Sequence, residues 1–442
     1  MADVDKKILD LNRFDAAAAV GTLDYAERVE RRNATFGASS VLFYDNPIEM
    51  ERAEGAYLYD ASGIRYLDAY NNVPSVGHCH PRVVEAVSRQ IGQLNIHTRY
   101  LNSVVETYAE HLLATFPPGL SNLVMTCTGS EANDLAMRIA QTVSSGQGFI
   151  VTEAAYHGNT ALVTEISPSS LRKRGPASFV RMIPAPSGDD PAIIAASFKA
   201  SVEAAITDLW ENGIRFAGLI VDSIFSSDGI YADPVGFLAP AVDVVRKSGG
   251  LFIADEVQPG FGRTGGGMWG FSRHGIVPDI VTMGKPMGNG FPMGGVVTSP
   301  DFLAHFCEDT GYFNTFGGNP VAAAAGLAVL DVIEEEKLIE NARIVGAYFV
   351  DRLADMATRH DRVGNIRGAG LFIGVDLTSV HSKAADPGLT VSVINAMKNR
   401  GVLIGAAGKS GSTLKIRPPL CFTKVDVDFF AEKLSQSLKG LS

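Results

Sequence analysis

Between residues 80 and 335, short apolar runs alternate with longer segments in which apolar residues recur every three or four positions. A short apolar run is typical of a strand buried on both faces, and the longer spacing is typical of a helix that covers a sheet. This alternation predicts an α/β fold with a mostly parallel central sheet. The predicted strands are 123–126, 149–152, 179–183, 216–221, 251–254 and 280–283.

The pattern changes after an Ala-rich helix predicted over residues 320–336. Beyond it, helical spacing near 338–360 is followed by a short strand near 371–376 and by a last amphipathic helix, which together indicate a smaller α+β unit. We therefore predict three parts of the chain. They are an N-terminal segment, 1–70, that contributes to the small domain, a large domain, 71–335, and a C-terminal small domain, 336–442. Loops are predicted at 184–191 and 405–412, which are rich in Pro, Gly, Ser or Asp.

Composition narrows the class of protein. Of the 442 residues, 46% are hydrophobic and 19% are charged, so the chain can build substantial cores. The 38 Lys and Arg residues against 48 Asp and Glu residues give a formal net charge of −10, which argues against a nucleic-acid partner. The longest apolar stretch, 320–330, is much shorter than the roughly 20 residues of a membrane span, so no membrane partner is expected.

Several features favour a cytoplasmic protein without a metal. The four cysteines are far apart and form no CxxC pair, and the apolar run 16–20 is too short for a secretory core. The His-Cys-His segment at 78–80 does not predict a metal site, because adjacent ligands point in different directions. Segment 260–265 matches the dinucleotide pattern GxGxxG, but more glycine follows it instead of a helix, so a loop is predicted.

The first segment with candidate chemistry is the turn between the strand at 123–126 and the helix that follows it. Gly129 and Ser130 stand at the predicted start of this helix, where unpaired backbone N–H groups and the helix dipole attract an anion. Glycine lets the anion approach, and serine adds a hydroxyl group. The segment predicts a phosphate site, with an ordinary Ser or Thr helix cap as the alternative.

Two further predicted strands lead into charged residues. Asp255 follows the strand at 251–254, at the edge where open α/β sheets bind ligands, and a buried carboxylate there needs a cationic partner. Lys285 follows the strand at 280–283 within a Gly-rich turn, and a lysine in a water-poor pocket becomes a nucleophile that forms Schiff bases. Taken alone, either residue is more often a solvated charge.

A phosphate site, a strand-end acid, an imine-forming lysine and an aromatic ring at Tyr156 are together the parts that pyridoxal 5'-phosphate requires. With these motifs the chain resembles the class III aminotransferases, which are fold type I pyridoxal-phosphate enzymes, over residues 46–438. The resemblance implies that Lys285 binds the cofactor covalently and that Asp255 pairs with its ring nitrogen. Gly129 and Ser130 would hold its phosphate.

The resemblance also implies further cofactor contacts and an assembly. Tyr156 and Val257 are expected on the two faces of the ring, and Gln258 is expected near the ring hydroxyl. Thr315 would reach the phosphate from a second subunit. A homodimer with its active site at the subunit interface is therefore implied.

The chain departs from the aminotransferase pattern at two informative places. Lys415 stands three residues before the pair Pro418-Pro419, where transaminases that act on carboxylates usually have an arginine, whose guanidinium binds carboxylates in a bidentate manner. The pair Asp222-Ser223 stands where they commonly have Glu-Pro. The stretches 70–81, 283–290 and 415–421, together with Arg99, resemble the ethanolamine-phosphate phospho-lyases.

This second resemblance implies a lyase that acts on a small amino-phosphate, with Arg99, Lys415 and Arg417 as candidate phosphate-binding cations. Lys285 would remove a proton from the carbon beside the amine, and phosphate would leave from the neighbouring carbon of O-phosphoethanolamine, giving acetaldehyde, ammonia and phosphate. The alternative is a class III ω-aminotransferase that passes an amino group to a keto acid such as pyruvate. A regulator that only binds the cofactor is disfavoured, because Lys285 is retained and no basic helix-turn-helix segment precedes the fold. The sequence leaves open which of the three cations face the substrate.

Overall fold

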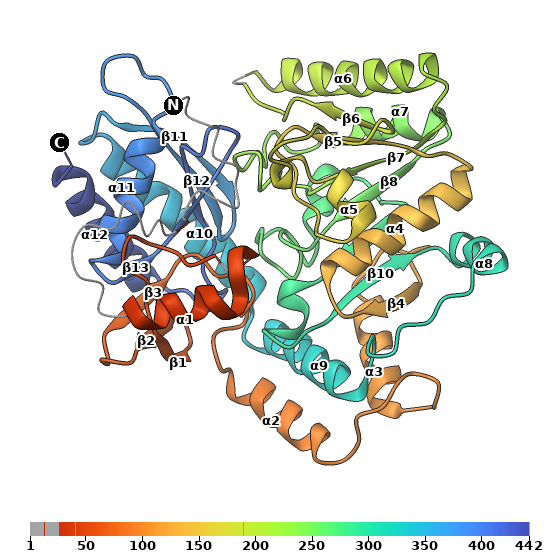
Figure 1. Cartoon of the computed structure of the whole chain (residues 1–442), viewed down its shortest axis with the longest axis horizontal. Helices are drawn as coiled ribbons and strands as arrows, with labels where there is room; N and C mark the ends of the chain where they lie inside the picture. Colours follow the sequence, from red (N-terminus) through yellow and green to blue (C-terminus); the bar gives the residue numbers. More distant parts are fainter. Residues whose placement is uncertain (1–12, 14–25, 40, 189, 442) are drawn as a thin grey trace.

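The computed structural model describes residue 13 and residues 26–39, 41–188 and 190–441. The predicted apolar run 16–20 lies outside these residues. Figure 1 shows two lobes, one around a seven-stranded sheet and the other around two four-stranded sheets. The chain therefore combines an α/β lobe with a smaller lobe in which helices pack on antiparallel strands.

The central sheet has the strand order β4-β10-β9-β8-β7-β5-β6. Neighbouring strands pair in parallel except at β10, which is antiparallel to both β4 and β9. The six predicted strands are confirmed, each with bounds within one residue of the prediction. They are β4 (Asn122–Thr126), β5 (Gly148–Thr152), β6 (Val180–Ile183), β7 (Phe216–Val221), β8 (Leu251–Asp255) and β9 (Ile280–Met283).

The seventh strand, β10 (Gly294–Thr298), was not predicted. It begins with two glycines, which have low strand preference, so its apolar run is too short to be recognised. It forms a strand because it pairs with β4 on one side and β9 on the other, and these hydrogen bonds cannot be predicted from the local sequence.

Helices cover both faces of the central sheet and create two apolar cores. Along β5, Ile150 belongs to one core, whereas Phe149 and Val151 belong to the other, as the alternation of side chains in a strand requires. The helices of this lobe include α2 (Pro81–Ile91), α3 (Ser103–Leu113), α4 (Gly129–Ser144), α5 (Ala161–Glu165), α6 (Pro191–Glu211), α7 (Ala239–Lys247), α8 (Pro300–Asp309) and α9 (Pro320–Glu335).

The other lobe holds sheets of order β1-β2-β3-β13 and β11-β12-β15-β14. The predicted helices near its start and at its end are confirmed as α10 (Leu338–Ala357) and α12 (Lys424–Lys439), and the predicted strand as β12 (Phe372–Leu377). Its other elements are α1 (Ala26–Phe36), β1 (Met50–Glu54), β2 (Tyr57–Asp60), β3 (Arg65–Asp68), β11 (Val363–Ala369), α11 (Pro387–Lys398), β13 (Val402–Leu403), β14 (Gly405–Ala407) and β15 (Thr413–Ile416).

Two loop predictions have different outcomes. The prediction for 405–412 is wrong at its start, because β14 pairs antiparallel with β15 there although glycine and alanine are weak strand formers. Segment 260–265 forms turns, which confirms that its GxGxxG pattern does not open a helix.

The strands of the central sheet come from residues 122–298, and those of the smaller lobe come from residues 50–68 and 363–416. The domain boundaries after residues 70 and 335 stay predictions.

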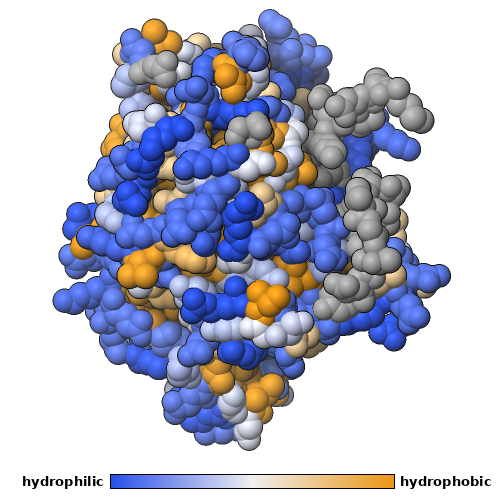
Figure 2. Space-filling view, turned by 90° about the vertical axis from the view of Figure 1, so that its left-hand side faces the viewer, coloured by the Kyte–Doolittle hydropathy of each residue, from blue (hydrophilic) through white to orange (hydrophobic). Residues whose placement is uncertain are grey.

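The surface of the smaller lobe is mostly hydrophilic, with hydrophobic residues scattered over it (Figure 2). Among the described residues, no helix combines the length and the apolar character of a membrane span.

His78 Nε2 lies 2.7 Å from a carboxylate oxygen of Asp68, so His78 of segment 78–80 is paired with a residue of the fold. In the described part of the chain, no three His, Cys, Asp or Glu residues gather as metal ligands would, and the four cysteines are free.

Candidate active site

A cavity of about 380 Å³ opens where several strands of the central sheet end. The segments that line it follow the carboxyl ends of β4, β5, β7, β8 and β9, as expected for a ligand site in an open α/β sheet. All the predicted cofactor residues except Thr315 line this cavity. They are Gly129, Ser130, Tyr156, Asp255, Val257, Gln258 and Lys285.

One end of the cavity is the N-terminus of α4. Thr128 caps the helix by accepting a hydrogen bond from Glu131 N at 3.1 Å, so the helix cap is present, and the phosphate site beside it stays a prediction. A Cβ atom at Gly129 would lie 2.8 Å from Val257 Cγ2, and one at Gly158 would lie 2.5 Å from Ser130 Oγ. Glycine is therefore required at both positions, and it leaves room for an anion at the helix end.

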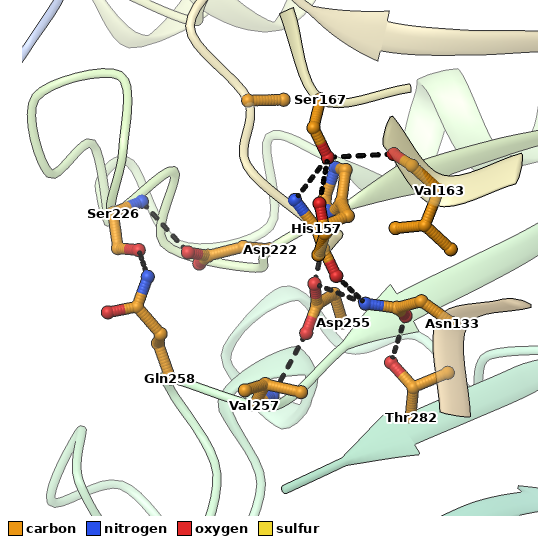
Figure 3. Close-up of polar contacts among 12 residues, drawn as sticks. Asn133, His157, Val163, Ser167, Asp222, Ser226, Asp255, Val257, Gln258 and Thr282 are labelled. Atoms are coloured by element: carbon orange, nitrogen blue, oxygen red, sulfur yellow. Dashed lines mark hydrogen bonds and ion pairs between the residues drawn. The ribbon is translucent and has the colours of Figure 1, made fainter. Parts of the chain in front are cut away.

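Asp255 is buried at the end of β8 and is held by several donors (Figure 3). Its Oδ1 accepts from Val257 N at 3.0 Å, while Oδ2 accepts from Asn133 Nδ2 at 3.1 Å and lies 2.7 Å from His157 Nδ1. Asn133 is itself fixed, since its Oδ1 accepts from Thr282 Oγ1 at 2.6 Å. The carboxylate thus has one orientation, set by three separate segments of the chain.

His157 and Asn133 are site residues that the sequence analysis missed. His157 Nε2 is buried and has no hydrogen-bond partner among the described residues, so Nδ1 carries the proton that Asp255 accepts. The available signals in the sequence were the adjacency of His157 to Tyr156 and the position of Asn133 one helical turn after Gly129. Neither signal identifies Asp255 as the partner without the fold.

Lys285 follows β9 and is only partly exposed, with its backbone in the left-handed region at a φ of 34°. Burial lowers the pKa of its amine to about 8, and the nearby charge of Arg417 adds to this effect. Asp255 and Asp222 oppose the shift by favouring the ammonium form. Near neutral pH the amine is therefore easier to deprotonate than that of an ordinary lysine.

Lys415 lies on β15 and Arg417 just after it, within electrostatic range of Lys285. Lys415 is only 4% exposed, and its pKa is well below the usual range because of burial first and the charge of Arg417 second. Arg417 donates from Nε to Tyr70 O at 2.7 Å, and its guanidinium carbon lies 4.7 Å from the centroid of the Tyr70 ring. The smaller lobe thus contributes two cations to the neighbourhood of the cavity.

Asp222 and Gln258 line the cavity on the side of the central sheet, and Gln258 contacts Arg417. Asp222 follows β7 and lines the cavity, and burial raises the pKa of its carboxyl group. Gln258 donates from Nε2 to Ser226 Oγ at 2.6 Å and accepts a hydrogen bond from Arg417 Nη1 (Figure 3 shows the bond to Ser226). The sequence analysis noted Asp222 only as a departure from a pattern and did not place it at the site.

Comparison with known proteins identifies the family. The profile described as aminotransferase class III matches residues 42–438. The chain belongs to the class III aminotransferase family. It is 40% identical to the Arabidopsis thaliana alanine-glyoxylate aminotransferase 2 homolog 2, mitochondrial, over 419 residues, which cover 93% of this chain and 87% of that protein.

Two phospho-lyases are also similar to this class III chain. The Caenorhabditis elegans ethanolamine-phosphate phospho-lyase homolog 1 is 36% identical over 435 residues, which cover 93% of each protein. A solved structure of a phospholyase from Arthrobacter in complex with phosphoethanolamine is 43% identical, with a TM-score of 0.91, and the match covers 94% of this chain and all of that one. The predicted α/β fold and the predicted resemblance to the class III family are thereby confirmed.

Pyridoxal 5'-phosphate is the cofactor of this class III family, and the residues of the cavity fit it. The free N–H groups at the start of α4 and Ser130 suit its phosphate, and the oriented carboxylate of Asp255 suits a cationic ring nitrogen. Lys285, with its lowered pKa, suits attack on the aldehyde, and Tyr156 and Val257 offer surfaces for the ring. These individual roles stay predictions.

Four predicted site residues do not line this cavity, namely the cofactor residue Thr315 and the three substrate cations Arg99, Lys415 and Arg417. Arg99 is exposed, and its guanidinium carbon stacks 3.8 Å from the centroid of the Phe313 ring. Thr315 is also exposed, in the segment that precedes α9. Neither residue lines the cavity described within a single chain, so any role for them there requires a second subunit.

Proposed function

We propose that this class III enzyme is a pyridoxal-phosphate-dependent phospho-lyase that eliminates phosphate from O-phosphoethanolamine. The observation that carries the proposal is a second group of cations near the cavity, in addition to the helix N-terminus of α4. Arg417 donates a hydrogen bond to Gln258 on the cavity wall, and Lys415 stands two residues before it on β15. One anion site suits the cofactor phosphate, and the second pair of cations suits a substrate phosphate. The similarity to a phospholyase whose structure contains phosphoethanolamine supports this choice.

The chain's own groups can perform the elimination. When bound, the cofactor withdraws electrons from the carbon that carries the substrate amine and so makes its C–H bond acidic. Lys285 Nζ then accepts the proton, and the electron pair of the C–H bond forms a double bond to the neighbouring carbon. The C–O bond breaks, phosphate leaves with its electron pair, and Lys415 and Arg417 stabilise the charge that develops on it. Water converts the remaining enamine to acetaldehyde and ammonia.

Phosphate release without a keto acid is the direct test of this proposal. The cofactor-loaded enzyme is incubated with O-phosphoethanolamine alone, and inorganic phosphate and acetaldehyde are measured together. Equal amounts of the two products are expected. A protein that releases neither, but consumes amines when pyruvate is added, would be an aminotransferase instead.

The aminotransferase function is the second candidate. It is favoured by the 40% identity to a relative named as an alanine-glyoxylate aminotransferase. In that reaction Lys285 would accept the proton from the substrate carbon and later release it, and no leaving group is needed on the substrate. The carboxylate of an amino acid or keto acid would pair with Lys415 as well, so the lyase is preferred on the similarity to the phospholyase whose structure contains phosphoethanolamine.

We further propose a homodimer in which Thr315 reaches the cofactor phosphate of the other subunit. Large apolar side chains gather on the surface near Thr315, where His97 contacts both Tyr100 and Phe313. Leu101 is 96% exposed and Phe316 is 70% exposed, which is unusual for a surface that faces only water. Sedimentation of the loaded enzyme tests the dimer, for which the mass of two chains is expected.

Cytoplasmic location also stays a prediction, since some relatives are named as mitochondrial proteins.

A further inference from the structure

The segment that carries Thr315 is exposed, yet its backbone is held in one shape. Thr315 and Phe316 are both exposed, and they lie in a turn that the side chain of Asn314 closes. Asn314 Oδ1 accepts hydrogen bonds from Gly317 N at 2.8 Å and from Phe316 N at 3.2 Å. An asparagine that binds backbone groups two and three residues ahead fixes a turn. The orientation of Thr315 within this turn is therefore set by its neighbour.

The turn is packed closely against the end of β4. A Cβ atom at Gly317 would lie 2.3 Å from Met125 O, and one at Gly318, whose φ is 73°, would lie 2.6 Å from Met125 Cε. Both positions therefore favour glycine. Beyond the turn, Asn319 caps α9 by accepting a hydrogen bond from Ala322 N at 2.9 Å. The turn thus has fixed supports on both sides, although its tip is exposed.

Asn314 also joins the turn to the start of α4. Its Nδ2 donates to Glu131 Oε2 at 3.2 Å, and the same oxygen accepts from Cys127 N at 2.7 Å. Glu131 lies in the first turn of α4, where the helix dipole stabilises a carboxylate, and Cys127 lines the cavity. The turn that carries Thr315 is therefore fixed to the helix end that is predicted to hold the cofactor phosphate of its own subunit.

We propose that Asn314, with Glu131 as its partner, is a positioning residue for the cofactor: it holds Thr315 in the orientation that binds the cofactor phosphate of the second subunit. The inference rests on the proposed homodimer, in which Thr315 reaches the site of the other subunit. A hydroxyl group on a turn that is already ordered loses less conformational entropy on binding a phosphate than one on a flexible loop. The hydrogen bonds of the Asn314 side chain supply this order before the cofactor binds.

The test compares pyridoxal 5'-phosphate with pyridoxal, which has the same reactive aldehyde but no phosphate. The cofactor is removed from the purified enzyme, and each compound is added back in an absorbance titration. Asn314→Ala is expected to raise Kd for pyridoxal 5'-phosphate about threefold to tenfold and to leave Kd for pyridoxal unchanged. Asn212→Ala is the matched control, because it also removes a side-chain bond to the backbone, at an exposed position after α6. Unchanged affinity for pyridoxal 5'-phosphate, or an equal loss for both compounds, overturns the inference.

An exchange of partners tests the bond to Glu131 in a protein that keeps the turn. Asn314→Asp retains the acceptor for the two backbone N–H groups but faces Glu131 with a second carboxylate, so affinity for pyridoxal 5'-phosphate is expected to fall. Adding Glu131→Gln restores a donor between the two side chains, and most of the affinity is expected to return. Absence of this recovery contradicts the role of the pair.

A double-mutant cycle shows whether Asn314 acts through Thr315. Thr315→Ala removes the hydroxyl group that is expected to bind the phosphate, so a further change at Asn314 has nothing left to position. The protein with both Asn314→Ala and Thr315→Ala is therefore expected to bind pyridoxal 5'-phosphate as tightly as Thr315→Ala alone. Additive losses overturn the inference.

Failure of the inference and failure of the proposed assembly give different results. If the parent enzyme sediments with the mass of one chain and Thr315→Ala binds the cofactor as the parent does, then the homodimer is wrong and the inference is wrong with it. If the parent is a dimer and Thr315→Ala weakens cofactor binding, but Asn314→Ala does not, then only the role of Asn314 is wrong. Neither readout depends on the reaction that the enzyme catalyses.

Discussion

Arg417 of the smaller lobe donates a hydrogen bond to the side-chain oxygen of Gln258, which lies on the cavity wall of the larger lobe. The Gln258 amide nitrogen donates in turn to Ser226. A residue predicted to lie near the cofactor ring hydroxyl is thus also the residue that orients a predicted substrate cation. One hydrogen bond therefore links the predicted cofactor site to the predicted substrate site.

Replacing Gln258 tests this link. In Gln258→Ala, Arg417 loses an acceptor while its bond to Tyr70 remains, so KM for O-phosphoethanolamine is expected to rise about threefold to tenfold. Steady-state kinetics measures the change, and cofactor titration gives the binding constant for pyridoxal 5'-phosphate. A change in cofactor affinity alone would show that Gln258 acts only on the cofactor side.

Lys285→Ala is expected to abolish covalent attachment of the cofactor and to reduce kcat about a thousandfold or more, because the proton acceptor is lost. Borohydride reduction followed by mass spectrometry measures the attachment. Lys409→Ala removes an exposed lysine, paired with Glu153, and is the control that keeps both properties. Normal turnover by the Lys285→Ala enzyme would refute the assignment.

Asp255→Asn keeps the shape of the side chain but removes its charge. The ring nitrogen then loses its anionic partner, so cofactor affinity is expected to fall and kcat to fall about a hundredfold. Absorbance titration with pyridoxal 5'-phosphate and initial rates provide the two measurements. An enzyme with unchanged kcat would mean that Asp255 serves only to hold His157 and Asn133.

Two lysines are expected to make the reaction depend on pH: Lys285 through kcat and Lys415 through KM. Lys285 must be neutral to accept a proton, and burial lowers its pKa to about 8, so kcat is expected to increase as pH rises through this value. Lys415 must stay protonated to bind phosphate, and its lowered pKa makes KM increase at higher pH. In Lys415→Arg the cation persists, so the alkaline increase in KM is expected to shift upward in pH.

Lys415 and Arg99 are expected to differ in their importance for substrate binding. Lys415→Ala removes a buried cation next to Lys285, and KM for O-phosphoethanolamine is expected to rise about tenfold or more with the cofactor retained. Arg99→Ala changes an exposed side chain that stacks on Phe313, so a smaller increase in KM is expected. Kinetics of the two variants at equal cofactor occupancy decides between them, and a larger effect at Arg99 would place it at the substrate across a subunit interface.

The parts of the site that the sequence predicts are those that depend on one strand and the turn after it. Asp255 and Lys285 each follow an apolar run directly, so their place at the edge of the sheet could be inferred from spacing alone. The bonds from Asn133 and His157 to Asp255 join positions more than 90 residues apart, and no local pattern encodes them. The same holds for Gln258 with Arg417, and for β10 and β14, which owe their strand structure to their neighbours.

Lys415 lies on β15 of the smaller lobe, and this location affects how the two lobes would share a ligand. The residues expected to hold the cofactor and to move the proton come from the larger lobe, while two cations expected to hold the leaving group come from the smaller one. In the proposed reaction, a molecule with an amine at one end and a phosphate at the other would therefore bridge the two lobes. The bound ligand would then help to hold the two lobes together. It would also fix the distance of the reacting carbon from the groups that bind the amine and from those that bind the phosphate.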